Sequence, residues 1–172
     1  YFIEVTTNRV DIASVYGVAR EAAAILPQFG IKARLQPVKR PTLKFTANTG
    51  YLDATVNHAL CPRFTAVLIR NVSLKDSPAW MKERLAAVGI RPINNIVDIS
   101  NYVMCELGQP VHTFDYDKIK GAKMVLRESR RGEKLTTLDG KTHTLPGGDI
   151  VIEDGGGRLI DLAGIMGGEN SA

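Results

Sequence analysis

The protein has 172 residues, enough for one ordinary domain with its own hydrophobic core. Its composition, 44% hydrophobic and 23% charged, is typical of a soluble globular protein, and no apolar run is long enough to cross a bilayer. Lys and Arg outnumber Asp and Glu by 22 to 18, a mild basic excess that permits contact with RNA without requiring it.

The chain opens on a strand-like run at 2–6, which a predicted helix over 11–26 follows. Seven apolar residues recur at helical spacing in that helix and form one stripe. Asp11 is its predicted N-cap, because a carboxylate accepts hydrogen bonds from the free amides of a first helical turn. We expect Pro27 to end the helix and Gly30 to turn the chain.

Residues 31–62 are basic and poorly patterned, which favours a crossing connection with a short strand near 43–47. Residues 64–74 are rich in β-branched and apolar side chains, and this composition predicts a strand.

Ser77-Pro78 predicts the start of a second helix, with Ser as N-cap and Pro at the first helical position. Gly89 fits the end of that helix, because glycine readily adopts the left-handed conformation that follows a last turn. A third helix is predicted over 96–107, and Gly108 ends it.

The pattern changes to short strands and tight turns after Phe114. One predicted hairpin joins 134–138 to 141–145 through Asp139-Gly140, and a second joins 150–153 to 158–163 through three glycines. Helices and strands do not alternate along the chain. The order therefore favours an α+β layered domain over a parallel α/β fold.

Residues 94–115 form an unusually polar segment that contains Asp98, Ser100, Asn101, Gln109, His112 and Asp115. The break at Gly108 would let Asn101 and His112 line one cleft from two elements. The alternative is local: the helix side chains bond to the backbone and His112 fills a niche in the core. The residues alone leave both interpretations open.

Two smaller motifs favour structural roles. The glycine run at 164–168 lacks the Lys of a phosphate loop, and indicates a turn with positive φ or a close backbone approach. His58 and Cys61 have the spacing of a metal-ligand pair, but no second pair completes a tetrahedral site, so we expect no metal. Cys61 and Cys105 form no disulfide framework, and nothing resembles a signal peptide, so we expect a cytoplasmic protein.

The sequence resembles the β subunits of bacterial-type phenylalanyl-tRNA synthetases. The similarity runs in order through TTNRVDIASVYGVARE, CPRFTAVLIRNV, SPAWMKERLAAVGIRPINNIVD and LAGIMGGENS, and it includes the polar segment 94–115. It implies the B3/B4 fold of that family, a layered β-sandwich with helices packed on one face. We expect 1–172 to be a single domain of this kind, truncated at both ends relative to a longer parent chain.

The resemblance also implies a function. Enzymes of this family are α2β2 ligases that join phenylalanine to tRNA(Phe) with ATP and Mg²⁺, and the synthetic site lies on the α subunit. Their B3/B4 domain hydrolyses tRNA(Phe) mischarged with tyrosine, because a pocket for phenylalanine cannot fully reject one added hydroxyl. The implied partners are tRNA(Phe) and the α subunit, with no membrane and no DNA. We expect no cofactor in this chain itself, and no editing by the isolated chain.

The family's editing site maps onto six positions. His112 and Asn101 match its catalytic residues, and the substrate pocket maps onto Ser100, Pro110, Gly167 and Arg91. Ser100 replaces the usual Thr and keeps its hydroxyl. The glutamate that reads tyrosine in the family lies beyond the Gly-Gly-Glu turn, so Glu169 does not match it. The alternative function is a non-catalytic or free-standing B3/B4-like module that binds tRNA or aminoacyl groups.

Overall fold

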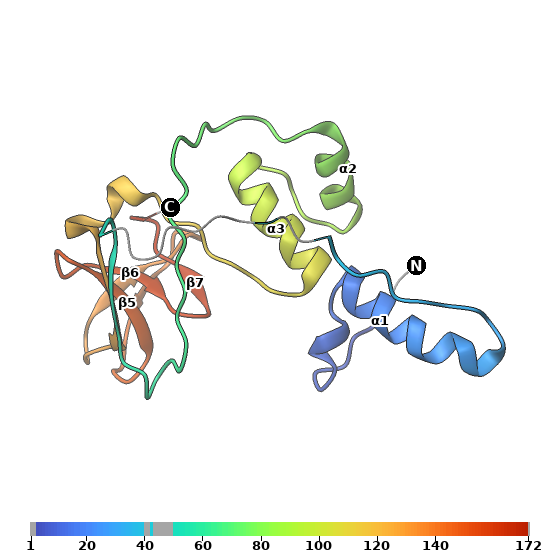
Figure 1. Ribbon diagram of the computed structural model, residues 1–172. Coiled ribbons are helices and arrows are strands. Elements are labelled where there is room, and N and C mark those ends of the chain that lie inside the picture. Colours follow the sequence, from blue (N-terminus) through green and yellow to red (C-terminus); the bar gives the residue numbers. More distant parts are fainter. Residues whose placement is uncertain (1–2, 40–41, 43–49, 172) are drawn as a thin grey trace. The chain divides into compact units, whose positions relative to one another are not determined.

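A computed structural model describes residues 3–39, 42 and 50–171 (Figure 1). Contacts between residues divide the chain into two compact units, each built from two stretches of sequence. We call them the helical unit, Tyr1–Leu43 with Ser73–Thr113, and the sheet unit, Lys44–Val72 with Phe114–Ala172.

Among its described residues, the helical unit contains three α-helices, labelled in Figure 1: α1 (Val15–Ile25), α2 (Ala79–Ala87) and α3 (Asn95–Leu107). Short 3-10 helices at Val10–Ile12 and Leu26–Phe29 flank α1. Both α1 and α2 pack against α3. The three predicted helices are confirmed, with α1 shorter than expected because its predicted first turn is a 3-10 turn.

The N-cap of α1 is Ser14, whose side chain accepts a hydrogen bond from Gly17 N at 2.9 Å. The prediction of Asp11 as N-cap is wrong, because Asp11 lies in the preceding 3-10 helix and pairs with Arg9 at 3.0 Å. The left-handed turn at Gly30 is confirmed by its φ of 72°.

The start of α2 also differs from the prediction. Pro78 takes the N-cap position, and the Ser77 hydroxyl donates instead to the carboxylate of Asp98 at 2.5 Å. Ser77 is buried, so its side chain joins α2 to α3 and does not cap α2. Gly89 follows the last turn with a φ of 81°, as predicted.

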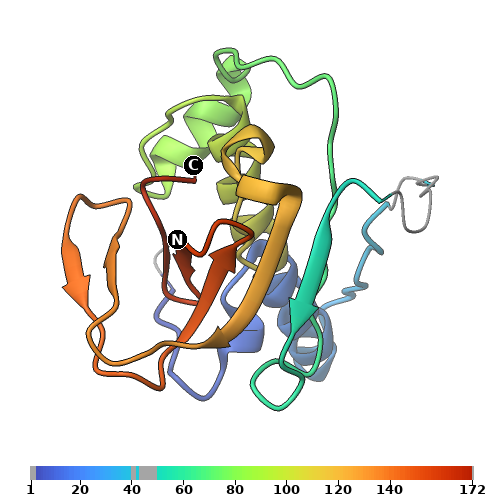
Figure 2. The same cartoon turned by 90° about the vertical axis from the view of Figure 1, so that its left-hand side faces the viewer.

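The sheet unit is built on a five-stranded mixed sheet in the order β1-β2-β5-β6-β7 (Figure 2). β1 runs parallel to β2 and the remaining neighbours are antiparallel. The strands are β1 (Asp53–Val56), β2 (Lys123–Glu128), β5 (Ile150–Asp154), β6 (Leu159–Leu162) and β7 (Met166–Gly167). Two 3-10 helices, Tyr116–Lys118 and Lys120–Ala122, lead into β2.

The predicted hairpin is confirmed as β3 (Lys134–Thr136) and β4 (Thr142–Thr144), seen beside the red strands in Figure 2. Its turn is longer than the predicted two residues, since the strands end at Thr136 and resume at Thr142, and within it the Thr137 hydroxyl donates to Asp139 at 2.5 Å. The second predicted hairpin is confirmed as β5 and β6.

Alternate residues of β5 and β6 face two separate cores, as expected for a sheet covered on both faces. Val151 and Leu159 pack against Leu135 and Leu145 of the β3–β4 hairpin region. The other core consists of Ile119, Met124, Leu126, Ile152 and Ile160. A mixed sheet together with three helices confirms the predicted α+β class.

The strand predicted at 64–74 is wrong. Residues 64–74 form no strand, and apolar side chains such as Ile69 remain largely exposed, at 73%. β-branched composition favours a strand only where a neighbouring strand pairs with it, and no described strand pairs with this run. The described part of the run at 2–6 is also not a strand. The strand predicted at 43–47 lies outside the described residues.

Candidate functional site

α3 carries two residues of the predicted site, Ser100 and Asn101. The Asn94 side chain caps the helix by accepting from Ile96 N and Val97 N at 3.0 and 3.1 Å. This cap fixes where the helix starts. It therefore also fixes which face each later residue occupies.

The Ser100 hydroxyl donates to the Val97 carbonyl at 2.8 Å. Ser100 therefore bonds to the local backbone, one of the two interpretations that the sequence left open. Asn101 differs from the structural asparagines of the same helix. The Asn95 side chain bonds to Ser73 and Lys75, whereas no hydrogen bond among the described residues involves the half-buried Asn101 amide. Asn101 therefore has a side chain whose hydrogen-bonding groups are not used by the fold.

The predicted end of α3 at Gly108 is confirmed, with a left-handed φ of 80°. The backbone there lies so close to Ser14 that an added Cβ would stand 3.3 Å from the Ser14 side chain. Pro110 and His112 follow in an exposed stretch outside any helix or strand. Arg91 is also exposed, in the connection between α2 and α3.

The glycine run at 164–168 shows both predicted features, a positive φ and a close backbone approach, but at Gly164 and Gly168 and not at Gly167. Gly164 has a left-handed φ of 74°, and a Cβ on Gly168 would lie 2.9 Å from the Ile160 carbonyl and from Asn170 Oδ1. Gly167 itself is buried in β7, where it pairs with Asp161.

The predicted site residues are divided between the units. Five of them, Arg91, Ser100, Asn101, Pro110 and His112, belong to the helical unit, and Gly167 belongs to the sheet unit. Their convergence on one site stays a prediction.

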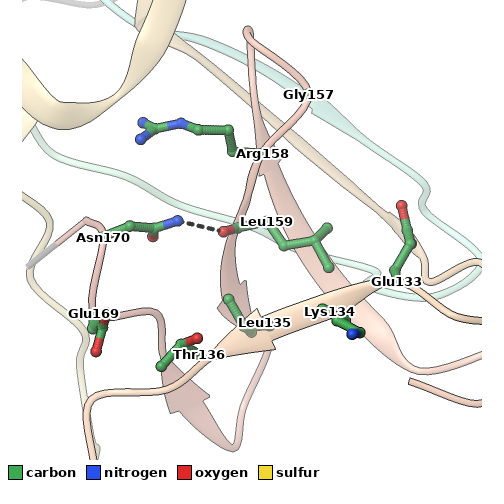
Figure 3. Close-up of a pocket in the computed structure, with 9 residues that line it drawn as sticks. All are labelled: Glu133, Lys134, Leu135, Thr136, Gly157, Arg158, Leu159, Glu169 and Asn170. Carbon is green, nitrogen blue, oxygen red and sulfur yellow. Dashed lines mark hydrogen bonds between the residues drawn. The ribbon is translucent and has the colours of Figure 1, made fainter. Parts of the chain in front are cut away.

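A pocket of about 440 Å³ lies within the sheet unit (Figure 3). It is lined by Glu133–Thr136 along β3, by Gly157–Leu159 at the start of β6, and by Glu169 and Asn170. The Asn170 Nδ2 donates to the Leu159 carbonyl at 3.0 Å, the dashed line in Figure 3. Sequence reasoning missed this pocket, because its three short segments are far apart in the chain and carry no common motif.

Glu133 on the wall of this pocket is held by an ion pair. Arg127 donates to the Glu133 carboxylate at 2.7 and 2.9 Å and also pairs with Glu153. The hydrogen bond from Arg127, helped by the Arg130 backbone amide, lowers the pKa of Glu133 to about 2 against the cost of burial. Glu133 is therefore ionised at neutral pH and paired with Arg127.

Arg158, on the opposite wall, forms an ion pair with the fully buried Asp154, to which it donates at 2.6 Å. Burial opposes ionisation of Asp154. Hydrogen bonds from the Arg158 backbone and guanidinium and from the Gly156 amide outweigh that effect and lower the Asp154 pKa. Glu133 and Arg158 are thus both used in ion pairs that stabilise the structure around the pocket.

The structure adds two negative observations for the described residues. They contain no group of three or more His, Cys, Asp or Glu side chains placed to hold a metal ion. Cys61, half of the spacing noted in the sequence, donates its thiol to the Arg63 carbonyl at 3.1 Å and packs beside the core. In the part of the chain that the structure describes, no helix has the length and apolar character needed to cross a membrane.

Comparison with known proteins agrees with the fold and with the motifs. The model of the B3/4 domain family matches residues 60–172. Phenylalanine–tRNA ligase β subunits of Dehalococcoides mccartyi (strain CBDB1), Clostridium tetani and Thermotoga maritima are 45, 47 and 41% identical to this chain over 98% of its length. The chain spans about a fifth of the length of these curated relatives, 20 to 21%. The chain belongs to the B3/4 domain family, in the form found in phenylalanine–tRNA ligase β subunits.

Proposed function

We propose that this chain is part of the proofreading domain of a phenylalanine–tRNA ligase β subunit, and that this domain, within the parent enzyme, hydrolyses tRNA(Phe) mischarged with tyrosine. The observation that carries the proposal is the B3/4 family match over residues 60–172, together with relatives at 41 to 47% identity that are all ligase β subunits. The same relatives make a free-standing binding module the weaker alternative.

The reaction is hydrolysis of the ester that joins the amino acid to the terminal ribose. Asn101 supports a binding role, since its half-buried amide makes no hydrogen bond among the described residues and so has donors and an acceptor for a ligand. His112 lies beyond the end of α3, where it would orient the ribose or the attacking water. We favour orientation, with backbone amides polarising the ester carbonyl, over a full general-base role for His112.

The remaining positions have supporting roles in this proposal. Ser100 and Pro110 would shape the pocket, and exposed Arg91 would hold a phosphate of the tRNA. Gly167 would leave space for the bound amino acid. In the parent enzyme the α subunit, ATP and Mg²⁺ would serve aminoacylation in the cytoplasm, and tRNA(Phe) would be the shared substrate of both activities.

The test separates the two activities in the full-length parent enzyme. We expect His112→Ala and Gly167→Val to lower the rate of tyrosyl-tRNA(Phe) hydrolysis by at least about tenfold, while phenylalanine charging stays within about twofold of the native rate. Asn95→Ala is the matched control on α3, because Asn95 bonds to Ser73 and Lys75 and has no predicted role in the site. The assignment would be contradicted if a folded variant lost both hydrolysis and charging. It would also be contradicted if His112→Ala and Gly167→Val both hydrolysed tyrosyl-tRNA(Phe) at the native rate.

A further inference from the structure

Three side chains of α2 and α3 form a compact cluster on the surface of the helical unit, which we call the Trp80 cluster: Trp80, Arg84 and Tyr102. The Trp80 and Tyr102 rings meet edge to face, with centroids 5.3 Å apart and planes at 89°. The Arg84 guanidinium lies over the Trp80 ring, 5.3 Å from its centroid, and donates to the Tyr102 hydroxyl at 2.6 Å.

The fold does not need Trp80 as a core anchor. Met81 and Leu85, one helical turn apart, make the buried face of α2. Trp80 and Arg84 are also one turn apart and form the adjacent stripe, where Trp80 is 48% exposed. A large aromatic ring is thus kept partly in water.

The geometry also holds the indole in place. Arg84 stacks on Trp80 and is itself fixed by Tyr102, so the ring's orientation does not depend on a ligand. A ring that is ordered before binding loses little entropy when a flat partner stacks on it.

We propose that the Trp80 cluster binds RNA by stacking an unpaired base on the exposed indole, with the Arg84 guanidinium close to the neighbouring phosphate. Single-stranded RNA is recognised through aromatic rings and arginine planes, because every base has a flat face and every nucleotide a negative charge. The cluster supplies both an exposed ring and a guanidinium. The choice of RNA as the partner rests on the proposed function, whose substrate carries an unpaired 3′ end.

Charge favours RNA over an apolar protein segment as the occupant. Arg84 is exposed and no ion pair among the described residues involves it, whereas Lys82 on the same helix is paired with Asp76. An apolar partner would have to desolvate the guanidinium without a matching charge, whereas a phosphate would meet it with one.

The sequence contains a single tryptophan, so the chain's own fluorescence reports on this site. We would titrate the 172-residue chain with an eight-nucleotide single-stranded RNA ending in CCA, and with the same strand annealed to its complement. Stacking predicts saturable quenching of Trp80 by the single strand and little quenching by the duplex.

The affinity of labelled RNA for variants then locates the contact. Trp80→Ala should weaken binding about tenfold, the effect expected for loss of one stacked base. Arg84→Lys keeps the charge but loses the planar guanidinium, and should weaken binding several-fold. Lys82→Gln is the matched control, because it removes one charge from α2 outside the cluster, where Lys82 pairs with Asp76 at 3.2 Å.

If Trp80→Ala and Lys82→Gln weakened RNA binding equally, general electrostatic attraction would explain the binding, and the proposal would be overturned. RNA binding without quenching of Trp80 would also overturn it, because the RNA would then bind outside the cluster. Circular dichroism of each variant checks that the helices persist. Because these measurements involve no hydrolysis, failed stacking with intact editing contradicts only this inference. Failed editing with intact stacking contradicts only the proposed function.

Discussion

The Asp98 side chain is fully buried, although it lies in the polar segment that suggested a functional site. It accepts from the Ser77 hydroxyl at 2.5 Å and from Ile93 N at 2.8 Å. These bonds join the start of α2 and the connection before α3 to the first turns of α3. Polarity at this residue therefore serves the packing of the helical unit, whereas Asn101, one turn away, has its amide unused by the fold.

Asp98→Ala should lower the free energy of unfolding by about 2 kcal/mol, because it leaves the buried Ser77 hydroxyl without its acceptor and removes the hydrogen bond from Ile93 N. Urea unfolding followed by Trp80 fluorescence measures this in the helical unit. Asp76→Ala is the control, since the Asp76 side chain is 89% exposed and its ion pair with Lys82 should contribute less than about 0.5 kcal/mol. Equal effects of the two changes would show that the Asp98 bonds do not stabilise the unit.

At the scale of elements, α2 and α3 end in the same way but in different surroundings. Gly89 and Gly108 have nearly equal φ values of 81° and 80°. An added Cβ on Gly89 would meet nothing described within 4 Å, whereas on Gly108 it would approach Ser14, the N-cap of α1. The end of α3 is therefore tied to the start of α1.

These two glycines give a matched pair of variants. Gly89→Ala should cost about 1 kcal/mol of unfolding free energy, the usual penalty of a left-handed alanine. Gly108→Ala should cost roughly 1 kcal/mol more, because the Ser14 side chain must also move. Thermal and urea unfolding measure both. Equal losses of unfolding free energy in the two variants would mean that Ser14 moves away from the added Cβ without an energetic cost.

The elements of the sheet unit are joined by the Arg127 ion pairs, which link β2 to Glu133 before β3 and to Glu153 on β5. The folded-state pKa of Glu133, about 2, lies below its ordinary value of 4.5. Its contribution to stability is therefore complete above about pH 4.5, and is lost as the pH falls towards 2.

Between pH 5 and pH 2.5 the native chain should lose about 1 kcal/mol more unfolding free energy than Glu133→Gln, after allowance for solvent screening of this partly exposed pair. Urea unfolding at a series of pH values measures the difference. Glu128→Gln, which changes an exposed residue of β2, should follow the native profile. Parallel profiles for native chain and Glu133→Gln would contradict the role given to this carboxylate.

At the scale of the whole molecule, the net charge of +4 limits contact with nucleic acid. We expect weak binding of RNA by this chain, with log Kd rising by no more than about 3 for each tenfold increase in salt, because few phosphates are neutralised. Fluorescence anisotropy between 50 and 300 mM salt, roughly the range in which such slopes are resolved, measures it. Tight binding that persists at high salt would contradict this expectation.

The sequence predicted what local residues determine. Glycines at helix ends and in hairpin turns act on the few residues beside them, so the end of α3, the turn at Gly89 and two hairpins were predicted near their observed places. β1 was missed, because its strand character depends on β2. The run at 64–74 has strand composition without a strand partner. The candidate site residues came from the family resemblance, and the pocket beside β3 came only from the structure.

The pairing of β1 with β2 joins Asp53 to Lys123, 70 residues later in the chain. The sequence between them contains the whole second stretch of the helical unit, Ser73–Thr113. On a ribosome β1 must therefore wait, without its neighbour, until both α2 and α3 have been synthesised, and this long-range closure should be a slow step of folding. Each unit is also interrupted by the other in the chain, so neither can be excised as one uninterrupted stretch for expression by itself.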